Sequence, residues 1–345
     1  MPVDAVPEKL LNWYDAHHRR LPWRAGPGEP RAAPYRVWLS EVMLQQTTVA
    51  AVKSYYAHFT TRWPTVADLA AADEAEVMAA WAGLGYYARA RNLIACARAV
   101  VNDHGGAFPD SEAGLRTLPG IGDYSAAAIA AIAFGRRAVV VDANVERVTS
   151  RLFAFDGPLP VGRPAIRELA DRITPDERAG DFAQAMMDLG SSICTVRNPQ
   201  CLICPLHGDC AARAAGNPEA YPVKAPKKAK PQRRGTAFWI ERDGHVWLVR
   251  RPAKGMLGGM RALPTGPWTD ADPGLAEAPA KADWVEAGSV DHVFTHFALR
   301  LRVVTTRKPA PLNEGEWWPI ARIEEAGLPT LFARAAARAI AAAQD

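Results

Sequence analysis

Apolar residues recur every three or four positions from the N-terminus to about residue 215, which is the period of one face of an α-helix. The pattern predicts a first helix over 6–18 and a second that begins at Pro34, because proline favours the first turn of a helix. Thr47 is expected to cap the start of a third helix with its hydroxyl. Residues 138–141 are the one candidate strand of this region. Further helices are expected near 66–71, 73–81, 110–117, 123–134, 143–154, 163–173 and 180–192.

The pattern changes at residues 221–235, Y-P-V-K-A-P-K-K-A-K-P-Q-R-R-G, which contain three prolines and six basic residues. This composition is typical of an extended linker. Beyond it, Asp243-Gly244 is a strong hairpin turn between two β-type runs. We therefore predict a helical region, 1–220, then the linker and a small α+β domain, 236–345. The elements expected in that domain are strands at 236–241, 245–250, 293–297 and 299–305 and a helix at about 329–343.

Composition narrows the class of protein. The 345 residues leave room for two domains, and 49% hydrophobic residues suffice for ordinary cores. No run of about 18 apolar residues occurs, so no membrane span is expected. The first residues include Asp4, Glu8 and Asp15 and do not resemble an export signal, which favours the reducing cytoplasm. A net charge of +4 is compatible with a polyanionic partner but does not require one.

Four of the five cysteines lie within 17 residues, with the spacing C-x6-C-x2-C-x5-C. In a reducing compartment such a group is more typical of a metal site than of disulfides. Thiolates bind either tetrahedral zinc or a [4Fe–4S] cluster. Structural zinc sites commonly use two C-x2-C pairs, and the single pair here favours the iron–sulfur cluster. Cys96 lies among apolar helix positions and fits a core residue. The four clustered residues are Cys194, Cys201, Cys204 and Cys210.

The stretch Leu118-Pro119-Gly120-Ile121-Gly122 is expected to form a tight turn between two helices. Glycine and proline supply the backbone conformations that such a turn needs. Unpaired N–H groups at the start of the second helix attract anions, so Gly120, Gly122 and Ser125 are candidates to hold a phosphate. The turn alone is equally compatible with a plain helix connection.

Several motifs stand in one order along the chain. They are W-L-S-E-V-M-L-Q-Q-T at 38–47, G-L-G-Y-Y-A-R at 83–89, L-P-G-I-G-D-Y at 118–124, V-D-A-N at 141–144 and M-D-L-G at 187–190, followed by the four cysteines. Together they closely resemble the MutY-type adenine DNA glycosylases of the helix–hairpin–helix, endonuclease III superfamily. The resemblance covers nearly the whole chain and is most specific over 8–212.

The resemblance implies a mostly α catalytic region of two helical lobes, with the iron–sulfur loop at 194–210 and DNA between the lobes. It implies a small α+β, Nudix-like domain for lesion recognition at 236–345. The implied activity is hydrolytic removal of adenine mispaired with 8-oxoguanine or guanine, during base excision repair. The implied partner is double-stranded DNA with an A:8-oxoguanine pair. We expect a monomer in the cytoplasm, associated with the nucleoid if the source is bacterial.

Two acidic residues fit the chemistry of this reaction. Adenine is a poor leaving group as an anion, so cleavage needs a general acid and a stabiliser for an oxocarbenium-like sugar. Glu41 lies towards a helix C-terminus among apolar residues, which should raise its pKa and keep it protonated. Asp142 lies at a helix N-terminus, where the dipole favours the ionised form. Taken alone, Asp142 fits a simple N-cap and Glu41 a solvated helix residue; their occurrence within matched motifs favours catalysis.

The resemblance also assigns roles to single residues. It implies that Glu41 protonates adenine and later activates water, while Asp142 stabilises or captures the sugar. Tyr124 stands where related glycosylase–lyases have a lysine, which implies a monofunctional enzyme. Tyr124 and Asn144 are expected near Asp142. Gln46 and Tyr86 match the residues that probe the duplex. The residues that match adenine-pocket positions are Trp23, Arg24, Leu44 and Asp188.

In the C-terminal part, Phe294, Thr295 and His296 resemble the Phe-Ser-His loop that senses 8-oxoguanine, with threonine in place of serine. A complete Nudix box is absent from the sequence, so nucleotide hydrolysis is not expected. Two alternatives stay open. One is another glycosylase of the superfamily, acting on a thymine mismatch or an oxidised pyrimidine. The other is a non-catalytic iron–sulfur protein that binds DNA or signals redox state.

Overall fold

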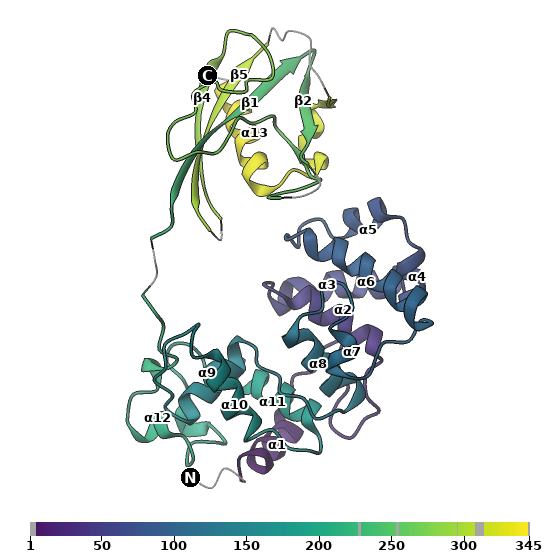
Figure 1. Ribbon diagram of the computed structural model, residues 1–345, viewed down its shortest axis with the longest axis vertical. Coiled ribbons are helices and arrows are strands. Elements are labelled where there is room, and N and C mark those ends of the chain that lie inside the picture. Colours follow the sequence, from purple (N-terminus) through teal and green to yellow (C-terminus); the bar gives the residue numbers. More distant parts are fainter. Residues whose placement is uncertain (1–4, 227–228, 253–254, 295, 308–313, 344–345) are drawn as a thin grey trace. The chain divides into compact units, whose positions relative to one another are not determined.

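The computed structural model describes residues 5–226, 229–252, 255–294, 296–307 and 314–343. Its contacts divide the chain into two compact units, 1–226 and 227–345, both drawn in Figure 1. The first unit is helical and the second is built on a β-sheet. The predicted fold class, a mostly α region followed by a small α+β domain, is therefore confirmed.

The helices of the first unit follow the apolar periodicity of the sequence. One cap differs from the prediction: Thr48, not Thr47, precedes the third helix, and its hydroxyl accepts from the Ala51 N–H at 3.3 Å. Gln46, between α2 and this cap, has a left-handed backbone conformation with φ +56°. The described helices are α1 (Ala5–His17), α2 (Pro34–Leu44), α3 (Val49–Arg62), α4 (Val66–Ala71), α5 (Glu74–Ala80), α6 (Ala88–His104), α7 (Glu112–Leu115), α8 (Asp123–Phe134), α9 (Ala143–Leu152), α10 (Arg163–Asp171), α11 (Ala179–Ser192) and α12 (Ala211–Ala214), with 3-10 turns at Cys201–Ile203 and Pro218–Ala220.

Helix α8 lies at the centre of this unit. Its alanine and isoleucine residues are buried on all sides, which is how a helix without a polar face is accommodated. It contacts α2 and α7 on one side and α11 on the other. Figure 1 shows α2 to α7 gathered on one side of α8, with α1 and α9 to α12 together on the other. Helix α1 joins the later group because it packs on α11.

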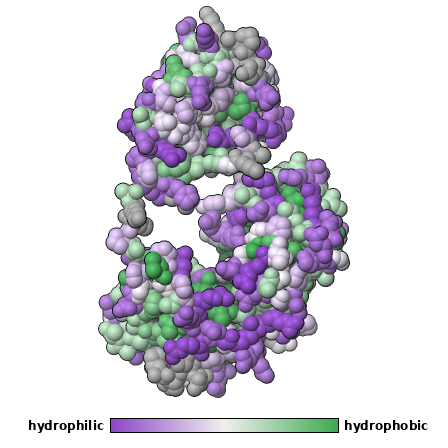
Figure 2. All heavy atoms as spheres, viewed as in Figure 1, coloured by the Kyte–Doolittle hydropathy of each residue, from purple (hydrophilic) through white to green (hydrophobic). Residues whose placement is uncertain are grey.

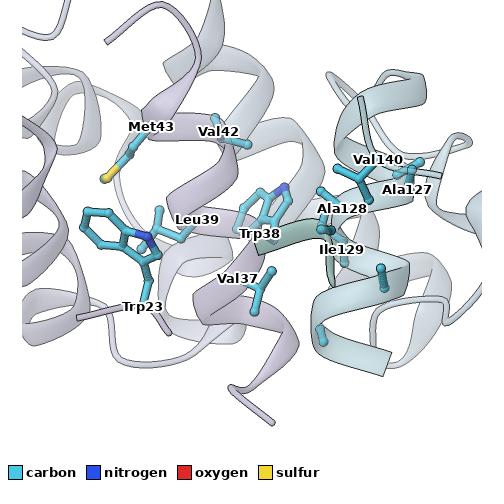
Figure 3. Close-up of a cluster of buried hydrophobic side chains, with 14 of the residues drawn as sticks. Trp23, Val37, Trp38, Leu39, Val42, Met43, Ala127, Ala128, Ile129 and Val140 are labelled. Carbon is cyan, nitrogen blue, oxygen red and sulfur yellow. The ribbon is translucent and has the colours of Figure 1, made fainter. Parts of the chain in front are cut away.

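The core between α2 and α8 contains Trp38, one of the largest fully buried side chains among the described residues. Trp38 is fully buried and packs against Phe108, with ring centroids 5.2 Å apart. Figure 3 shows Trp38 between the apolar face of α2 and the small residues of α8. Burial of a large aromatic side chain contributes about 2 to 3 kcal/mol to folding. This packing holds α2, and with it Glu41, rigidly against α8. Residues 138–141 form no strand and lead as an extended segment into α9.

The second unit is a mixed sheet covered by a helix. The strands are ordered β3-β2-β1-β5-β4, and β6 also pairs with β2. Strand β1 runs parallel to β5, and the other strand pairs are antiparallel. Asp243 and Gly244 both have positive φ in the β1–β2 hairpin, as predicted for such a turn. Helix α13 packs on β4 and β5. The bounds are β1 (Gln232–Arg242), β2 (His245–Arg250), β3 (Arg261–Ala262), β4 (Val285–Val293), β5 (Ala298–Thr306), β6 (Glu316–Pro319), a 3-10 segment (Ile320–Ala326) and α13 (Thr330–Ala342).

Two strand predictions need correction. Strand β1 begins at Gln232, inside the stretch expected as linker, because residues 232–240 pair in parallel with β5. Of the strand predicted at 293–297, Val293 is the last residue of β4, whereas Phe294 and Phe297 lie outside the strands, and the Phe294 N–H donates to the Phe297 carbonyl at 2.8 Å. Both phenylalanines pack on Trp268, so their apolar character serves this aromatic cluster and not a strand.

Hydrophilic residues cover much of the face that Figure 2 presents, and hydrophobic ones appear there as scattered patches. Within the described residues, none of the helices combines the length and the apolar composition that a membrane crossing requires.

Candidate active site

Glu41 lies in the last turn of α2 and is only 6% exposed. The Tyr124 hydroxyl, from the first turn of α8, donates a hydrogen bond to Glu41 Oε2 at 2.8 Å. Burial raises the pKa of Glu41 to about 7, although the Tyr124 hydrogen bond and the charge of Arg24 act to lower it. Burial likewise raises the pKa of Tyr124 well above its usual value, so the phenol keeps its proton and remains a donor. The carboxyl group of Glu41 can therefore hold a proton at neutral pH.

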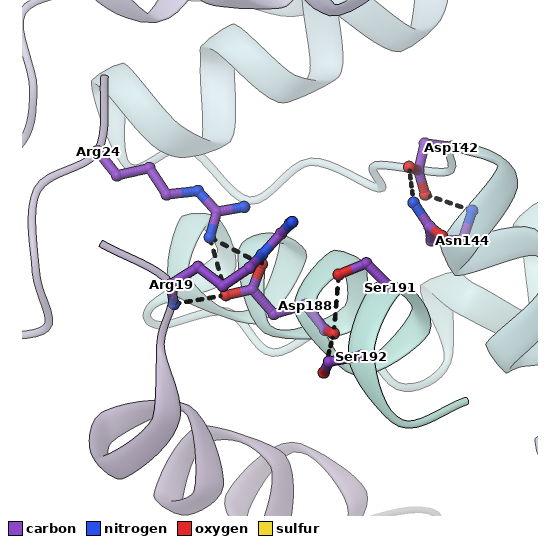
Figure 4. Close-up of polar contacts among 7 residues, drawn as sticks. All are labelled: Arg19, Arg24, Asp142, Asn144, Asp188, Ser191 and Ser192. Atoms are coloured by element: carbon purple, nitrogen blue, oxygen red, sulfur yellow. Dashed lines mark hydrogen bonds and ion pairs between the residues drawn. The ribbon is translucent and has the colours of Figure 1, made fainter. Parts of the chain in front are cut away.

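Asp142 is the N-cap of α9 and faces the same site. Its Oδ1 accepts from the backbone N–H groups of Asn144, at 2.9 Å, and Val145, at 2.7 Å. The Asn144 side chain donates to Oδ2 at 2.8 Å, as Figure 4 shows. Three N–H donors at a helix N-terminus suit a negative charge. Asp142 is near enough that its charge raises the pKa of Glu41 further. Glu41 is thus buried with one hydroxyl donor, whereas Asp142 is held by three N–H donors.

A buried ion-pair network lies beside these carboxyl groups. Asp188, on α11, is 1% exposed, and both of its oxygens accept from Arg24 Nη1, at 2.8 and 2.9 Å. The backbone N–H and Nε of Arg19 also donate to Asp188, at 2.9 and 2.6 Å. Figure 4 shows both arginines converging on this carboxylate. The structure therefore places Asp188 beneath Arg24, with its oxygens already occupied, and not on an open pocket wall.

The other residues expected at an adenine pocket differ in how far their side chains are buried. Trp23 is 4% exposed, and its ring packs edge-on against Tyr56 with centroids 5.2 Å apart. Leu44 is half-buried at the end of α2. Arg24 is buried, yet its charge reaches both Glu41 and Tyr124. Of the four, Arg24 is the one that these electrostatic contacts connect directly to Glu41.

The two expected duplex probes are exposed and share an unusual backbone. Gln46 follows α2, and Tyr86, 56% exposed, precedes α6. Their φ angles are +56° and +50°, in the left-handed region that residues other than glycine rarely adopt. Such outliers occur mainly at functional sites that the surrounding structure holds in place.

The predicted hairpin is the turn between α7 and α8. Gly120 has φ +76°, and a Cβ there would lie 2.7 Å from the Asn92 Cβ, so both conformation and space require glycine. Gly122 is the N-cap of α8 and has open space around it. Ser125 is 3% exposed, and its hydroxyl accepts from Gln45 Nε2 at 3.2 Å. The structure thus brings the two glycines to the turn but buries the Ser125 hydroxyl, because the side chain faces α2.

The four clustered cysteines occupy a loop between α11 and α12. All four are free, half-buried and close enough for their charges to interact. No group of His, Cys, Asp or Glu side chains among the described residues is arranged to hold a single metal ion. A four-iron cluster needs wider spacing than zinc, since each thiolate binds a different iron. Burial raises the pKa of Cys204 to about 12, so this thiol would release its proton on binding iron.

Two arginines that sequence reasoning missed hold this loop against α9. Arg147 donates to the carbonyls of Cys194, at 2.8 Å, and Gly190, at 2.6 Å, and to the Asn144 side chain at 2.9 Å. Arg151 is 2% exposed and donates to Cys194 Sγ at 3.3 Å and to the Thr195 carbonyl at 2.6 Å. The sequence feature that could have pointed to these two arginines is their spacing of one helical turn on the helix that starts with Asp142. The cysteine loop is thereby connected to the helix that carries Asp142.

In the second unit, Phe294 stacks on Trp268 with centroids 5.6 Å apart, and the His292 ring lies edge-on to Phe294 at 4.5 Å. His296 is exposed, in the connection between β4 and β5. Thr295 lies outside the described residues. Phe294 is therefore anchored inward by aromatic contacts.

Three family models match the chain. They are the HhH-GPD superfamily base excision DNA repair protein over 39–172, the iron-sulfur binding domain of endonuclease III over 194–210 and the NUDIX domain over 236–338. The fold and the site thus define a helix–hairpin–helix base excision DNA repair protein. The loop match confirms the prediction of a [4Fe–4S] cluster over zinc.

The chain is 34% identical to the human adenine DNA glycosylase, over 87% of this chain and 66% of that protein. It is 42% identical to the adenine DNA glycosylase of Mycobacterium tuberculosis strain H37Rv, over 66% of this chain and 72% of that one. The chain belongs to the adenine DNA glycosylase family. It spans just under two thirds of the length of the human relative.

Among solved structures, a thermostable thymine-DNA glycosylase is similar, with a TM-score of 0.54 and 31% identity. The match covers 61% of this chain and 95% of that one.

Proposed function

We propose that this protein is a monofunctional DNA glycosylase that hydrolyses the bond between adenine and deoxyribose where adenine is mispaired with 8-oxoguanine or guanine. The observation that carries the proposal is the pair of unlike carboxyl groups: Glu41, buried with a pKa of about 7, and Asp142, held by three N–H donors. Two carboxyl groups in such different environments can act as a general acid and a stabiliser of positive charge. The names of the relatives indicate that adenine is the base that is removed. The geometry of Glu41 and Asp142 indicates how its bond to the sugar is cleaved.

In the first step, protonated Glu41 donates to a ring nitrogen of adenine. The C1′–N bond then breaks, its electron pair leaves with the neutral base, and the sugar acquires oxocarbenium character. The carboxylate of Asp142 stabilises that positive charge or captures C1′ transiently. Water then attacks C1′ and passes its proton to Glu41, which restores the acid. The Tyr124 hydroxyl keeps Glu41 Oε2 in position throughout.

Tyr124 also supports hydrolysis over strand cleavage. A glycosylase–lyase needs an amine nucleophile to form a Schiff base with the sugar, and a phenol that keeps its proton cannot serve. We therefore expect an abasic site as the product, with an intact strand.

Access to the adenine requires that it leave the base stack, which costs a few kcal/mol. The exposed side chains of Gln46 and Tyr86 are proposed to penetrate the duplex, while the turn at Gly120 and Gly122 holds a phosphate through backbone N–H groups. Residues 236–345 are proposed to recognise 8-oxoguanine through Phe294, Thr295 and His296, with 221–235 as the connection. We propose that the protein acts as a monomer on double-stranded DNA.

The test is single-turnover base release from duplexes that contain one A:8-oxoguanine, A:G, A:T or T:G pair, with alkali added to half of each sample. We expect adenine release from A:8-oxoguanine and A:G and strand breaks only after alkali. Glu41→Gln should lower the rate at least ~10²-fold, because it removes the general acid. Glu74→Gln, on the surface helix α5, is the matched control and should not change the rate.

The outcomes separate the alternatives. Release of thymine from T:G would move the specificity towards that of the similar thymine-DNA glycosylase structure. An unchanged rate for Glu41→Gln would exclude the assigned acid. If iron-loaded protein bound DNA but released no base from any duplex, a non-catalytic DNA-binding protein would be indicated.

A further inference from the structure

One side chain connects the two exposed turns that carry Gln46 and Tyr86. The guanidinium of Arg89, in the first turn of α6, donates from Nη1 to the carbonyls of Val42, at 3.0 Å, Met43, at 3.1 Å, and Gln45. From Nη2 it donates to the Thr47 hydroxyl and to the Leu84 carbonyl, both at 3.2 Å. Its contacts thus lie on both sides of Gln46, at the C-terminal end of α2 and in the turn before Tyr86.

These contacts fix two strained residues. Gln46 and Tyr86 both have positive φ, and neither is a glycine. Such conformations persist only where neighbouring groups determine them. Arg89 binds the carbonyl before Gln46 and the hydroxyl after it, and its guanidinium carbon lies 5.4 Å from the Tyr86 ring centroid. One rigid group therefore constrains both residues.

The chemistry of these contacts requires arginine. Its planar fork presents donors in several directions, whereas the ammonium of lysine is a single point that cannot reach both turns. In the described part of the chain no carboxylate forms an ion pair with Arg89, and its Nε is buried without a hydrogen bond. The side chain is half-buried and stacks on Trp81, which itself donates to the Gly85 carbonyl at 3.0 Å. Arg89 is therefore oriented inward and is not a free surface charge for a phosphate.

We propose that Arg89 is a positioning residue that presents Gln46 and Tyr86 as one rigid pair and ties that pair to the end of α2, three residues after Glu41. The inference rests on the proposed function, because it assigns penetration of the duplex to these two side chains. It goes beyond that function in placing the control of their geometry in a residue that touches neither base nor sugar. The pair then enters the stack in a fixed orientation relative to the general acid.

The first test compares Arg89→Lys with wild type on two DNA substrates. One is a duplex with an A:8-oxoguanine pair; in the other the same adenine is a single-base bulge, already outside the stack. We expect the variant to lower single-turnover release ~10-fold to 10²-fold on the paired duplex, as small misplacements do, and to leave the bulge nearly unaffected. Equal losses on both substrates, or no loss on either, would overturn the proposal.

Two further variants control for general damage. Arg98→Lys changes an exposed arginine of the same helix α6, which donates a long hydrogen bond of 3.4 Å to the Ala70 carbonyl, and should leave both rates unchanged. Thr47→Val removes a single acceptor of Arg89 while keeping the side-chain volume. It should lower release from the paired duplex ~3-fold, with the bulge unchanged, because one of several contacts is lost. This variant keeps the test valid if Arg89→Lys folds poorly.

A second measurement needs no catalysis. In a duplex with 2-aminopurine beside the mispair, binding of Glu41→Gln protein should raise fluorescence as the pair unstacks the bases. Adding Arg89→Lys should remove most of that rise while DNA is still bound at saturation; an unchanged rise would contradict the role of Arg89. If wild type releases no adenine, the proposed function fails, and this fluorescence comparison still decides the role of Arg89.

Discussion

At the scale of single residues, the central feature is a carboxyl group that folding makes hard to ionise. Glu41 loses nearly all contact with water when α2 packs on α8, and its partner Tyr124 is a neutral donor. Arg24 lies close enough to oppose the rise in pKa but is itself neutralised by Asp188. Asp188 therefore limits how far the arginine lowers the pKa of Glu41. The proton that the proposed reaction needs is held by this balance.

The same burial makes a prediction about stability. The pKa of Glu41 rises from 4.5 to about 7 on folding, so the folded state favours the protonated form. This contribution is fully present below about pH 4.5 and is lost as pH rises towards 7. Glu41→Gln stays neutral, so its free energy of unfolding should exceed that of wild type by roughly 3 kcal/mol near pH 8, and by much less near pH 4.5. Denaturant unfolding of both proteins at the two pH values measures this; an advantage independent of pH would contradict it.

At the scale of elements, the close approach of α9 and α11 positions Asp142. Gly190 of α11 faces Asn144 of α9, and a Cβ at Gly190 would lie 2.6 Å from the Asn144 Cβ. Asn144 in turn donates to Asp142 and accepts from Arg147. Two residues of the M-D-L-G motif thus have separate structural roles on one helix. The aspartate binds Arg24, and the glycine leaves space for Asn144.

Gly190→Ala should therefore displace Asn144 and disturb the donors of Asp142. We expect adenine release to fall ~10-fold or more, since misplacement near a reacting group is costly, with a loss of about 1 to 3 kcal/mol in stability from overpacking. Glu74→Gln, an exposed position on α5, is the control. Single-turnover rates and thermal unfolding are the measurements. Wild-type rates for Gly190→Ala would show that Asp142 does not depend on this contact.

At the scale of the whole molecule, chemistry and lesion recognition are assigned to separate cores. Glu41, Asp142 and the four cysteines all belong to the unit 1–226, while Phe294 and His296 belong to 227–345. Each unit has its own hydrophobic cluster. A chain that ends after Pro226 should therefore fold, bind iron and release adenine.

That truncated chain should lose most of its preference for A:8-oxoguanine over A:G, because the proposed sensing turn is removed. The ratio of single-turnover rates on the two duplexes measures the preference. The iron–sulfur absorbance of the truncated protein controls for its folding. A ratio equal to that of the full chain would assign recognition of 8-oxoguanine to residues 1–226.

The sequence by itself determined features that depend on neighbours along the chain. Helical periodicity defined the helices around Glu41 and Asp142, glycine spacing located the turn at Gly120, and cysteine spacing indicated the iron–sulfur loop. These properties follow from local backbone preferences and from the short reach of a loop. The family motifs likewise located Tyr124, which the structure places on Glu41.

Only the tertiary structure decided which side of each element faces the protein. It placed Asp188 beneath Arg24, turned the Ser125 hydroxyl towards Gln45, and paired β1 in parallel with β5. It also showed that Arg89, the last residue of the motif at 83–89, is directed inward to two turns. The partners in these contacts are tens of residues apart or more, and burial of a polar side chain depends on whether such partners arrive. The local sequence pattern does not tell whether such a partner reaches a given side chain, whereas the packing of the folded chain does.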